Sequence, residues 1–474
     1  MDFRDVPEDI LLQIVSYLSV QDVLALKQTC RVLHAFGSTD YLWHRLIEKS
    51  DLILDIPVNV PIGGLSADDL QLRAIQAIRL QRNWRSASSR IKRKTPLGTA
   101  SDALFEHIQF VAGGRWLLTA QGSRRFENRN HTKISLWSLA NIQDPHCVAQ
   151  FELVGKHRNS SVTVQLAEKL VTFVVALFDG SRDFIEIRIV QLDFEINVLD
   201  PMSPSPVTIT SRRLEIPPSP EDDPTITLMS LIEGISVCEN TLVATIARII
   251  PGREISSRIL IADTRMGSAR WILHDRHIVV LGHVGKDFTV RVYEMPRLPS
   301  SGIHSNGDPQ GSPEEVHTVE WGPIIKQYQY TLGGSPMDPI HIPHVFTTSL
   351  AIMIFNDELG RIIHFPFDKP SKPPRDIEVP LPADISIRLV GIGASGRRAV
   401  WMEHSLETTR SRIMKLEVEK TESGGLELFH GELLPPDSPL PFSTDACHMF
   451  AFDEATCRLC LGLWDGSLYI VDFM

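Results

Sequence analysis

The chain has 474 residues, of which 43% are hydrophobic and 22% are charged, and its formal net charge is −11. This length exceeds that of one ordinary domain, so we expect a small unit beside a large one, or a single large array of repeats. The acidic balance argues against a general nucleic-acid-binding protein. The longest apolar run, residues 171–178, is far shorter than the ~20 residues that a membrane-spanning helix needs.

Two further features of the sequence bear on the compartment. The N-terminus, Met1-Asp2-Phe3-Arg4-Asp5, is acidic and leads into no apolar core segment, so no secretory signal is visible. The six cysteines are neither dense nor evenly spaced, which is typical of free thiols in a reducing compartment. We therefore expect a soluble intracellular protein that is cytoplasmic, nuclear or both.

The first fifty residues predict several short helices. Pro7 stands where a helix would begin, because its missing N–H costs nothing there, and Ser19 with Asp22 has the spacing of a capping box. Large apolar side chains recur at helical spacing, namely Ile10, Leu11, Leu12, Ile14, Val15, Tyr17, Leu18, Val23, Leu26, Leu33, Leu42, Trp43, Leu46 and Ile47. A unit of ~50 residues cannot bury this much apolar surface on its own, so we expect it to bind a partner.

The same segment resembles an F-box. The resemblance runs through Pro7-Glu8-Asp9-Ile10-Leu11, Ile14, Ser16-Tyr17-Leu18, Asp22-Val23-Leu24, Leu26, Thr29-Cys30-Arg31, Leu33 and Leu42-Trp43, with Val6-Pro7 in place of the usual opening Leu-Pro. It implies that the apolar helix faces bind a Skp-type adaptor and, through it, a cullin–RING ubiquitin ligase. The residues implied for adaptor binding are Pro7, Ile10, Leu11, Ile14, Leu18, Leu24, Leu26, Leu33, Leu42 and Trp43. Some of these ten must instead hold the helices to each other, and an N-terminal helical cap is the alternative.

A loop and a longer helix are expected next. Residues 51–64 carry two prolines and two glycines, which indicates a loop. Ser66 and Asp69 then form a capping pattern, and apolar residues at helical spacing predict a helix of about twenty residues that ends at Arg85. Residues 77–85 resemble a segment of fungal F-box proteins that carry a C-terminal propeller. A helix of this length spans ~30 Å, so it would hold the F-box at a fixed distance from the rest of the chain.

Six basic residues cluster at the end of this helix and beyond it, namely Arg82, Arg85, Arg90, Lys92, Arg93 and Lys94. We interpret them as a solvated face. A nuclear import signal at residues 92–94 and docking on an acidic partner remain open alternatives.

Beyond residue 95 the helical periodicity stops, and paired apolar or β-branched runs predict seven hairpins. The runs are 116–119 with 134–137, 171–178 with 185–192, 242–250 with 258–263, 277–281 with 288–293, 350–355 with 361–367, 399–402 with 413–418, and 459–464 with 467–472. Asp465-Gly466 between the last two runs predicts a turn whose two central residues both have φ > 0.

Repeated hairpins that cannot bury their faces alone indicate a β-propeller, and Trp464-Asp465-Gly466 resembles the end of a degenerate WD-repeat blade. We expect about seven blades, with six or eight open, and a pair of packed β-sandwiches as the alternative fold. The chain stops soon after the seventh hairpin, so residues near 84–100 are expected to supply the missing outer strand of the last blade. The predicted fold is multidomain: a small all-α F-box domain (1–50), a loop and linker helix (51–94), and an all-β propeller (95–474).

Two sequence motifs resemble functional sites, but we expect both to be structural. Residues 391–396 have the glycine spacing of a dinucleotide-binding loop, but a strand pattern rather than a helix comes after them, so we expect a tight turn. Cys457 and Cys460 would point to opposite faces of a strand and are expected to be buried core residues rather than metal ligands. We therefore expect no catalytic residues, no cofactor and no metal, and a protein that is not an enzyme.

Together these features predict the substrate-recognition subunit of an SCF-type (Skp–cullin–F-box) E3 ubiquitin ligase. The F-box would dock on the Skp adaptor, and the propeller would bind an unknown protein that is to be ubiquitinated. No nucleic acid or membrane is expected as a partner. An F-box scaffold protein that acts outside a ligase is one alternative, and a propeller enzyme with a cofactor in its central channel is another.

Overall fold

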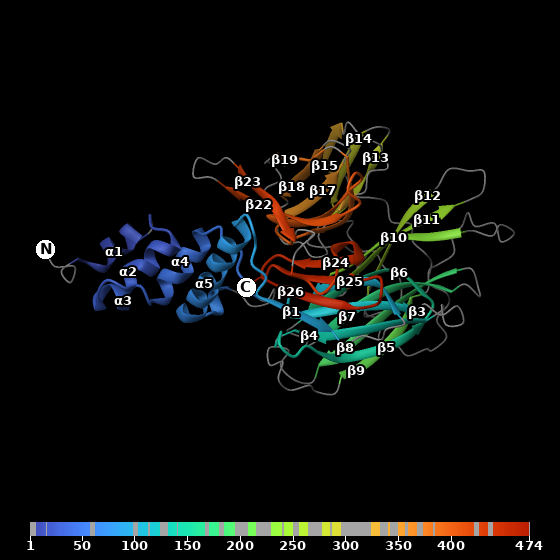
Figure 1. The fold of residues 1–474 in the computed structure, drawn as a ribbon, viewed down its shortest axis with the longest axis horizontal. Helices are drawn as coiled ribbons and strands as arrows, with labels where there is room; N and C mark the ends of the chain where they lie inside the picture. Colours follow the sequence, from blue (N-terminus) through green and yellow to red (C-terminus); the bar gives the residue numbers. More distant parts are fainter. Residues whose placement is uncertain are drawn as a thin grey trace, which may run out of the picture.

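The computed structural model has a helical N-terminal part beside a larger part built from β-sheets (Figure 1). The structure describes residues 6–15, 17–56, 62–97, 103–111, 114–123, 131–139, 141–165, 170–179, 184–194, 207–214, 229–238, 241–249, 256–263, 277–284, 287–294, 324–331, 340–341, 349–355, 359–366, 373–382, 384–420, 426–434 and 439–473.

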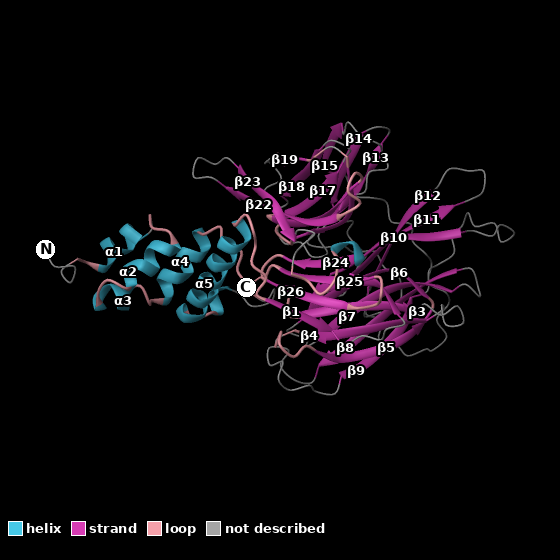
Figure 2. Cartoon of the chain, viewed as in Figure 1, coloured by secondary structure: helices cyan, strands magenta, loops and turns pink. Residues whose placement is uncertain are grey.

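The helical part contains the elements that the sequence predicts. Its helices are α1 (Glu8–Val15), α2 (Val20–Lys27), α3 (Arg31–Phe36), α4 (Asp40–Lys49) and α5 (Ala67–Arg85), and a 3₁₀ turn lies at Ile62–Gly64 (Figure 2). Ser19 and Asp22 form the expected capping box at the start of α2, and Ser66 caps α5 by accepting a hydrogen bond from the backbone N–H of Asp69. No helix in the described ranges is long and apolar enough to cross a membrane.

The core of the helical part joins α1–α4 to the first half of α5. Its buried residues are Leu11, Val15, Val20, Val23, Leu33, Phe36, Leu42, Trp43, Leu46, Ile47, Ala67, Leu70, Ala74 and Ile78. The indole N–H of Trp43 donates to the carbonyl oxygen of Gly37 at 2.8 Å, and Asp40 Oδ1 accepts the backbone N–H of Ala67 at 2.6 Å. Part of the apolar surface that fifty residues cannot bury alone is therefore buried against α5.

The β part consists of short antiparallel strands. Its strands are β1 (Arg93–Leu97), β2 (Ala103–Val111), β3 (Trp116–Ser123), β4 (His131–Ser138), β5 (His146–Val154), β6 (Lys156–Gln165), β7 (Leu170–Asp179), β8 (Phe184–Phe194), β9 (Val207–Leu214), β10 (Met229–Cys238), β11 (Thr241–Ile249), β12 (Ser256–Asp263), β13 (His277–Val284), β14 (Asp287–Glu294), β15 (Ile324–Thr331), β16 (Ile340–His341), β17 (Ser349–Phe355), β18 (Leu359–Pro366), β19 (Arg375–Pro380), β20 (Ile385–Ile392), β21 (Arg398–Ser405), β22 (Ser411–Lys420), β23 (Leu426–Leu434), β24 (Cys447–Asp453), β25 (Arg458–Leu463) and β26 (Leu468–Asp472). A 3₁₀ turn at Thr444–Ala446 precedes β24.

These strands form seven sheets of three or four strands each. In chain order the sheets are β2–β5, β6–β9, β10–β12, β13–β15, β16–β19, β20–β23, and β24–β26 with β1. All seven predicted hairpins are confirmed as antiparallel neighbours within them. Each sheet takes its strands from one stretch of chain, except that β1 joins the last one.

The pairing of β1 with β26 confirms the expectation that residues near 84–100 complete the last sheet. The two strands run antiparallel, with Thr95 opposite Ile470. The hydroxyl of Thr95 also donates to the carbonyl oxygen of Ile142 at 3.0 Å. The start of the β part therefore covers the edge of its last strand, which would otherwise be free to pair with another chain.

Neighbouring sheets pack through their apolar faces. Four buried apolar clusters each join one pair of sheets. The pairs are β16–β19 with β20–β23, β20–β23 with β24–β26, β24–β26 with β2–β5, and β2–β5 with β6–β9. Strand β10 lies against β6, and the rings of Tyr328 in β15 and Phe365 in β18 are 5.2 Å apart. From β13–β15 through β24–β26 to β2–β5 and on to β10–β12, the sheets therefore follow one another in space in the order of the chain.

The last hairpin differs from its prediction in one respect. Gly466 has φ = +90°, but Asp465 is not among the residues with positive φ. The backbone N–H of Leu463 donates to the carbonyl oxygen of Ser467 at 2.9 Å, so three residues rather than two form the loop. The prediction of two central residues with φ > 0 is wrong, because a three-residue loop needs only its last residue in the left-handed region.

Candidate partner-binding surface

Helix α1 exposes a row of large apolar side chains. Ile10, Ile14 and Tyr17 have exposed fractions of 40%, 49% and 89%. Spacings of four and three residues place them on one side of the helix and its C-terminal turn. Leu11 and Val15, on the other side, are buried in the helical core. Three large apolar residues exposed together on so short a helix and the turn after it form a surface suited to binding another protein.

The structure sorts the ten residues that the F-box resemblance implies for adaptor binding. Three of them are exposed: Pro7, Ile10 and Ile14. Three are partly buried: Leu18, Leu24 and Leu26. Four are buried in the helical core: Leu11, Leu33, Leu42 and Trp43. The expectation that some of the ten hold the helices together is confirmed. Tyr17, the most exposed apolar residue of this surface, was absent from the set, although its position three residues after Ile14 could have indicated it.

Helix α5 connects the helical part to the sheets. Trp84, near its C-terminal end, is buried, and its indole N–H donates to the carbonyl oxygen of Leu416 at 3.3 Å. The ring stacks on Phe452 at a centroid distance of 5.5 Å and meets Phe473 edge-on at 6.4 Å. Asn83 Nδ2 donates to the carbonyl oxygen of Phe473 at 2.6 Å. The end of α5 is therefore part of the core between β20–β23 and β24–β26.

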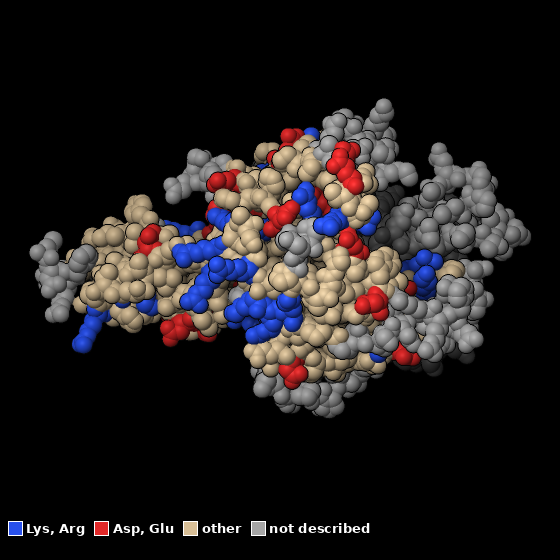
Figure 3. All heavy atoms as spheres, in the orientation of Figure 1, with Lys and Arg blue, Asp and Glu red and all other residues tan. Residues whose placement is uncertain are grey.

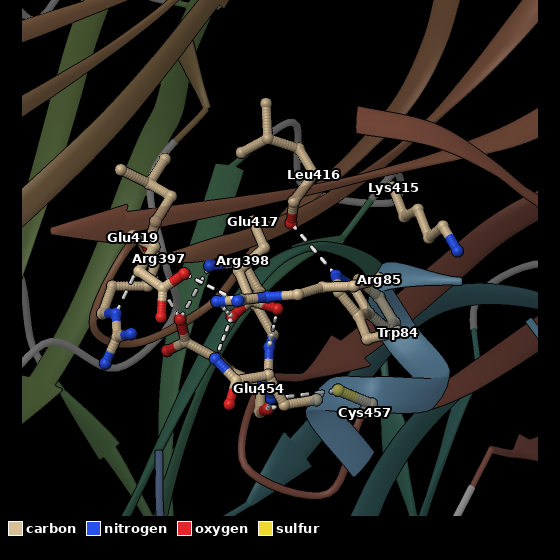
Figure 4. A network of polar contacts seen from close by, with 12 residues as sticks. Trp84, Arg85, Arg397, Arg398, Lys415, Leu416, Glu417, Glu419, Glu454 and Cys457 are labelled. Carbon is tan, nitrogen blue, oxygen red and sulfur yellow. Dashed lines mark hydrogen bonds and ion pairs between the residues drawn. The ribbon is translucent and has the colours of Figure 1, made fainter. Parts of the chain in front are cut away.

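A buried ionic network fixes the same end of α5 (Figure 4). Arg85 lies 2.9 Å from Glu417 Oε1 and 2.6 Å from Glu419 Oε2, and Gln81 Nε2 donates to Glu417 Oε1 at 3.0 Å. The other Glu417 oxygen is 3.3 Å from Arg398 Nε. Burial opposes ionisation of Glu417, but Arg398, Arg85 and Gln81 together hold its pKa below the ordinary value. The carboxylate therefore stays charged inside the protein.

This network corrects the interpretation of the basic cluster as a solvated face. Arg82, Arg90, Lys92 and Lys94 are exposed and Arg93 is partly so, but Arg85 is partly buried and paired with Glu417 and Glu419. The sequence separation between Arg85 and Glu417 is 332 residues, so no local pattern could reveal the pair.

The segment between α4 and α5 makes further contacts with the sheets. The guanidinium of Arg397 donates to the backbone carbonyl oxygen of Asp51, and Arg115 Nη2 lies 3.9 Å from Asp55 Oδ2. After α5, Lys415 Nζ donates to the carbonyl oxygen of Ser86 at 2.6 Å. The helical part is thus joined to the sheets before, within and after α5.

The glycine-rich turn at residues 391–396 binds a carboxylate of the protein itself. Glu454 accepts hydrogen bonds from the backbone N–H groups of Ser395, Arg397 and Arg398 at 2.7, 2.9 and 2.8 Å, and from the Ser395 hydroxyl at 2.7 Å. These donors are the kind that a phosphate would need. The turn joins β20 to β21 without a helix, which confirms that it is a strand-to-strand turn.

The two cysteines of the CxxC pattern are buried as expected, but Cys457 lies in the turn before β25, with φ = +51°, rather than on the strand that holds Cys460. Cys457 and Cys460 are both fully buried, and they belong to different apolar clusters. Burial raises the pKa of Cys457 to about 12 and that of Cys460 well above its ordinary value. Among the residues that the structure describes, no group of three or more His, Cys, Asp or Glu side chains could hold a metal ion.

Comparison with known proteins identifies one family. Residues 3–49 match the model of the F-box-like family, so the chain has an F-box-like domain there. This match covers α1–α4 and ends before α5. No curated protein matches the chain.

Several solved structures resemble the chain weakly. A prolyl endopeptidase aligns at 13% identity over 78% of this chain and 48% of its own, with a TM-score of 0.36. Prolyl oligopeptidase B from Galerina marginata aligns at 10% identity over 78% of this chain and 40% of its own, with a TM-score of 0.32. A chain of the mitotic checkpoint complex aligns at 10% identity over 81% and 94%, with a TM-score of 0.38. The chain spans less than half the length of the two peptidases, and at these scores none of the three supports an inference about function.

Proposed function

We propose that this chain is a substrate-recognition subunit of an SCF-type E3 ubiquitin ligase. Its F-box-like domain would dock on a Skp-type adaptor, and its sheets would bind the protein that is to be ubiquitinated. The observation that carries the proposal is the exposed apolar row of α1, because it lies within the segment that matches the F-box-like family. An unpartnered apolar surface in that segment is what adaptor binding requires.

Within this proposal the ten implied residues have two roles. Pro7, Ile10 and Ile14, together with the partly buried Leu18, Leu24 and Leu26, would contact the adaptor, and Tyr17 joins them on the same surface. The four buried residues would act indirectly, by holding the helices in the arrangement that presents this surface.

We further propose that the seven sheets form a closed, seven-bladed propeller of degenerate WD-repeat type, as in fungal F-box proteins. The order of the sheets and the β1–β26 pairing support a closed ring, whose last contact would join β10–β12 to β13–β15. The proposed domains are the F-box at 1–50, the loop and linker helix at 51–94, and the propeller at 95–474.

The linker helix gives this arrangement its mechanical basis. The first half of α5 belongs to the helical core and its end belongs to the core between two sheets. A continuous helix fixed at both ends would hold a bound substrate in one orientation relative to the adaptor. Ubiquitin transfer would belong to the assembled ligase, and this chain would contribute proximity and orientation.

The test is co-purification of the full-length chain with a Skp-type adaptor and a cullin, beside an Ile10→Glu/Ile14→Glu variant. Truncating a central interface anchor costs about 2 kcal/mol or more, roughly 30-fold in affinity, and two buried charges cost more, so we expect capture to be lost. Leu11 is unsuitable for this purpose because it is buried in the core.

A Leu72→Glu/Val154→Glu variant is the matched control, because it makes the same chemical change at two exposed residues of α5 and β5. It should capture both partners normally. Capture of the adaptor without the cullin would favour a scaffold outside a ligase. Undiminished capture by the α1 variant, or no capture by the unmodified chain, would contradict the proposal.

A further inference from the structure

A groove of about 550 Å³ lies between α2 and α5, and one residue of α3 also lines it. Its walls are formed by α2 and its C-cap residue Gln28, by His34 of α3, and by Gln71, Ile75, Ile78, Arg79 and Arg82 of α5. Five of these residues come from α5, beyond the segment that matches the F-box-like family. The groove is therefore built by the junction of the two parts rather than by the F-box-like domain alone.

The charged side chains that line this groove are all basic. Lys27, Arg79 and Arg82 line it, and its walls contain no Asp or Glu. Arg79 and Arg82 are exposed, and Arg82 Nη2 donates to Gln21 Oε1 at 2.7 Å across the groove. Asp68, one turn before Gln71 on α5, attracts Lys27 electrostatically. Basic residues accumulate here although the whole chain carries a net charge of −11.

Lys27 supplies a cation deep in the groove. Only 8% of its surface is exposed, its ammonium group donates to Gln71 Oε1, and it lies 5.9 Å from the centre of the Trp43 ring. A buried ammonium gains from a nearby anion, because the charge is poorly solvated there.

The basic character continues beyond the groove. Arg90 and Lys92 lie between α5 and β1, and Arg93 and Lys94 are the first two residues of β1. Figure 3 shows Lys and Arg side chains gathered where the helices meet the sheets. An approaching anionic partner would therefore meet a positive surface larger than the groove itself.

We propose that this groove binds an acidic amphipathic helix of a protein partner. Apolar side chains of that helix would lie over Leu24, Ile75 and Ile78, and its carboxylates would meet Lys27, Arg79 and Arg82. The liners run along α5 from Gln71 to Arg82, a rise of ~17 Å, which is the length of about 12 helical residues. A single-stranded nucleic acid fits less well, because His34 is the one aromatic ring among the lining residues and no Phe, Tyr or Trp joins it to form a platform for base stacking.

Fluorescence anisotropy with the full-length chain tests this proposal. The probe is a labelled peptide of about 15 residues with leucines at helical i, i+4, i+7 and i+11 positions and glutamates beside them. An Arg79→Glu/Arg82→Glu variant should weaken its binding at least ~10-fold, because two attractive contacts become repulsive. Ile75→Gln should weaken it several-fold by removing apolar contact while preserving helix propensity. Added salt should weaken binding by the unmodified chain.

The matched control is Arg375→Glu/Arg410→Glu, which makes the same charge change at two exposed arginines of the β part and should bind the peptide normally. The proposal is overturned if the unmodified chain does not bind the peptide, if a peptide with lysines in place of the glutamates binds equally, or if the α5 variant binds unchanged. Tighter binding of a single-stranded oligonucleotide would reassign the surface to nucleic acid.

This proposal is independent of adaptor binding. If the Arg79→Glu/Arg82→Glu variant loses a Skp-type adaptor as well as the peptide, the groove belongs to the adaptor surface and the separate partner is refuted. If the Ile10→Glu/Ile14→Glu variant loses the adaptor and keeps the peptide, the groove is a separate binding site.

Discussion

Along α1, Ile10 and Ile14 keep almost half of their surface in solvent, whereas at the end of α5 even the charged groups of Glu417 and Arg398 are buried and paired. Both helices belong to the same helical part, and both carry large apolar side chains. They differ in what surrounds them, because α5 packs against two sheets of its own chain, whereas α1 lies at the end of the helical part that is remote from the described strands (Figure 1). The exposed face of α1 is therefore a surface that could bind another protein, whereas the end of α5 is a joint whose contacts are all made within this chain.

The largest expected effect of a single substitution is at the joint. Trp84→Ala should lower the free energy of unfolding by about 3–5 kcal/mol, because it opens a cavity between Phe452 and Phe473. Chemical denaturation monitored by circular dichroism measures this loss. Trp464→Ala at an exposed tryptophan is the matched control and should change stability by only ~0.5 kcal/mol. Equal losses in the two variants would show that α5 is not fixed to the sheets.

The ionic network should contribute somewhat less. Glu417→Gln leaves Arg398 and Arg85 without their shared carboxylate and should cost about 3 kcal/mol. Glu378→Gln breaks a pair with Arg361 on an exposed part of β19 and should cost less than ~1 kcal/mol. Denaturation of both variants at neutral pH measures this difference, and similar losses would contradict the picture of a buried network.

The same network predicts a dependence on pH. The pKa of Glu417 in the folded chain lies below its ordinary value of 4.5, so the unfolded chain binds the proton more tightly. The stabilisation is complete above pH 4.5 and is lost as the pH falls through the folded pKa. The stability difference between the unmodified chain and Glu417→Gln should therefore shrink in acid. A difference that stays constant below pH 4 would contradict this assignment.

The smallest effect on stability is expected at α1. Ile10→Ala/Ile14→Ala should change the free energy of unfolding by about 1 kcal/mol or less, because both side chains keep almost half of their surface in solvent and alanine favours helix. Denaturation beside Leu11→Ala, whose buried side chain should cost about 2–5 kcal/mol, measures the contrast. If Ile10→Ala/Ile14→Ala lost as much stability as Leu11→Ala, the face of α1 that carries Ile10 and Ile14 would be packed within the chain.

Local patterns in the sequence predict much of this fold. Apolar spacing places the helices, and alternating runs place all seven hairpins, because both periodicities follow from backbone geometry. The β1–β26 pairing is also predictable, since a last hairpin without an outer strand leaves an edge that some other segment must cover.

What the sequence does not predict depends on contacts between distant residues. In the sequence Arg85 is one member of a basic run, yet its partner Glu417 is 332 residues away. Likewise, Leu11 and Ile14 belong to the same helical pattern, and only the packing of α1 against its neighbours separates the buried residue from the exposed one. The groove between α2 and α5 has the same origin, because it exists only once the two helices meet.

The most direct test of the central claim is amide hydrogen exchange of the full-length chain with and without a Skp-type adaptor. Short helices with exposed faces open locally and exchange readily. We predict that the adaptor protects residues 7–18 strongly and leaves the end of α5 around Trp84 unchanged, because that end is already buried by the sheets. Protection confined to the sheets, or no protection of α1, would contradict the account.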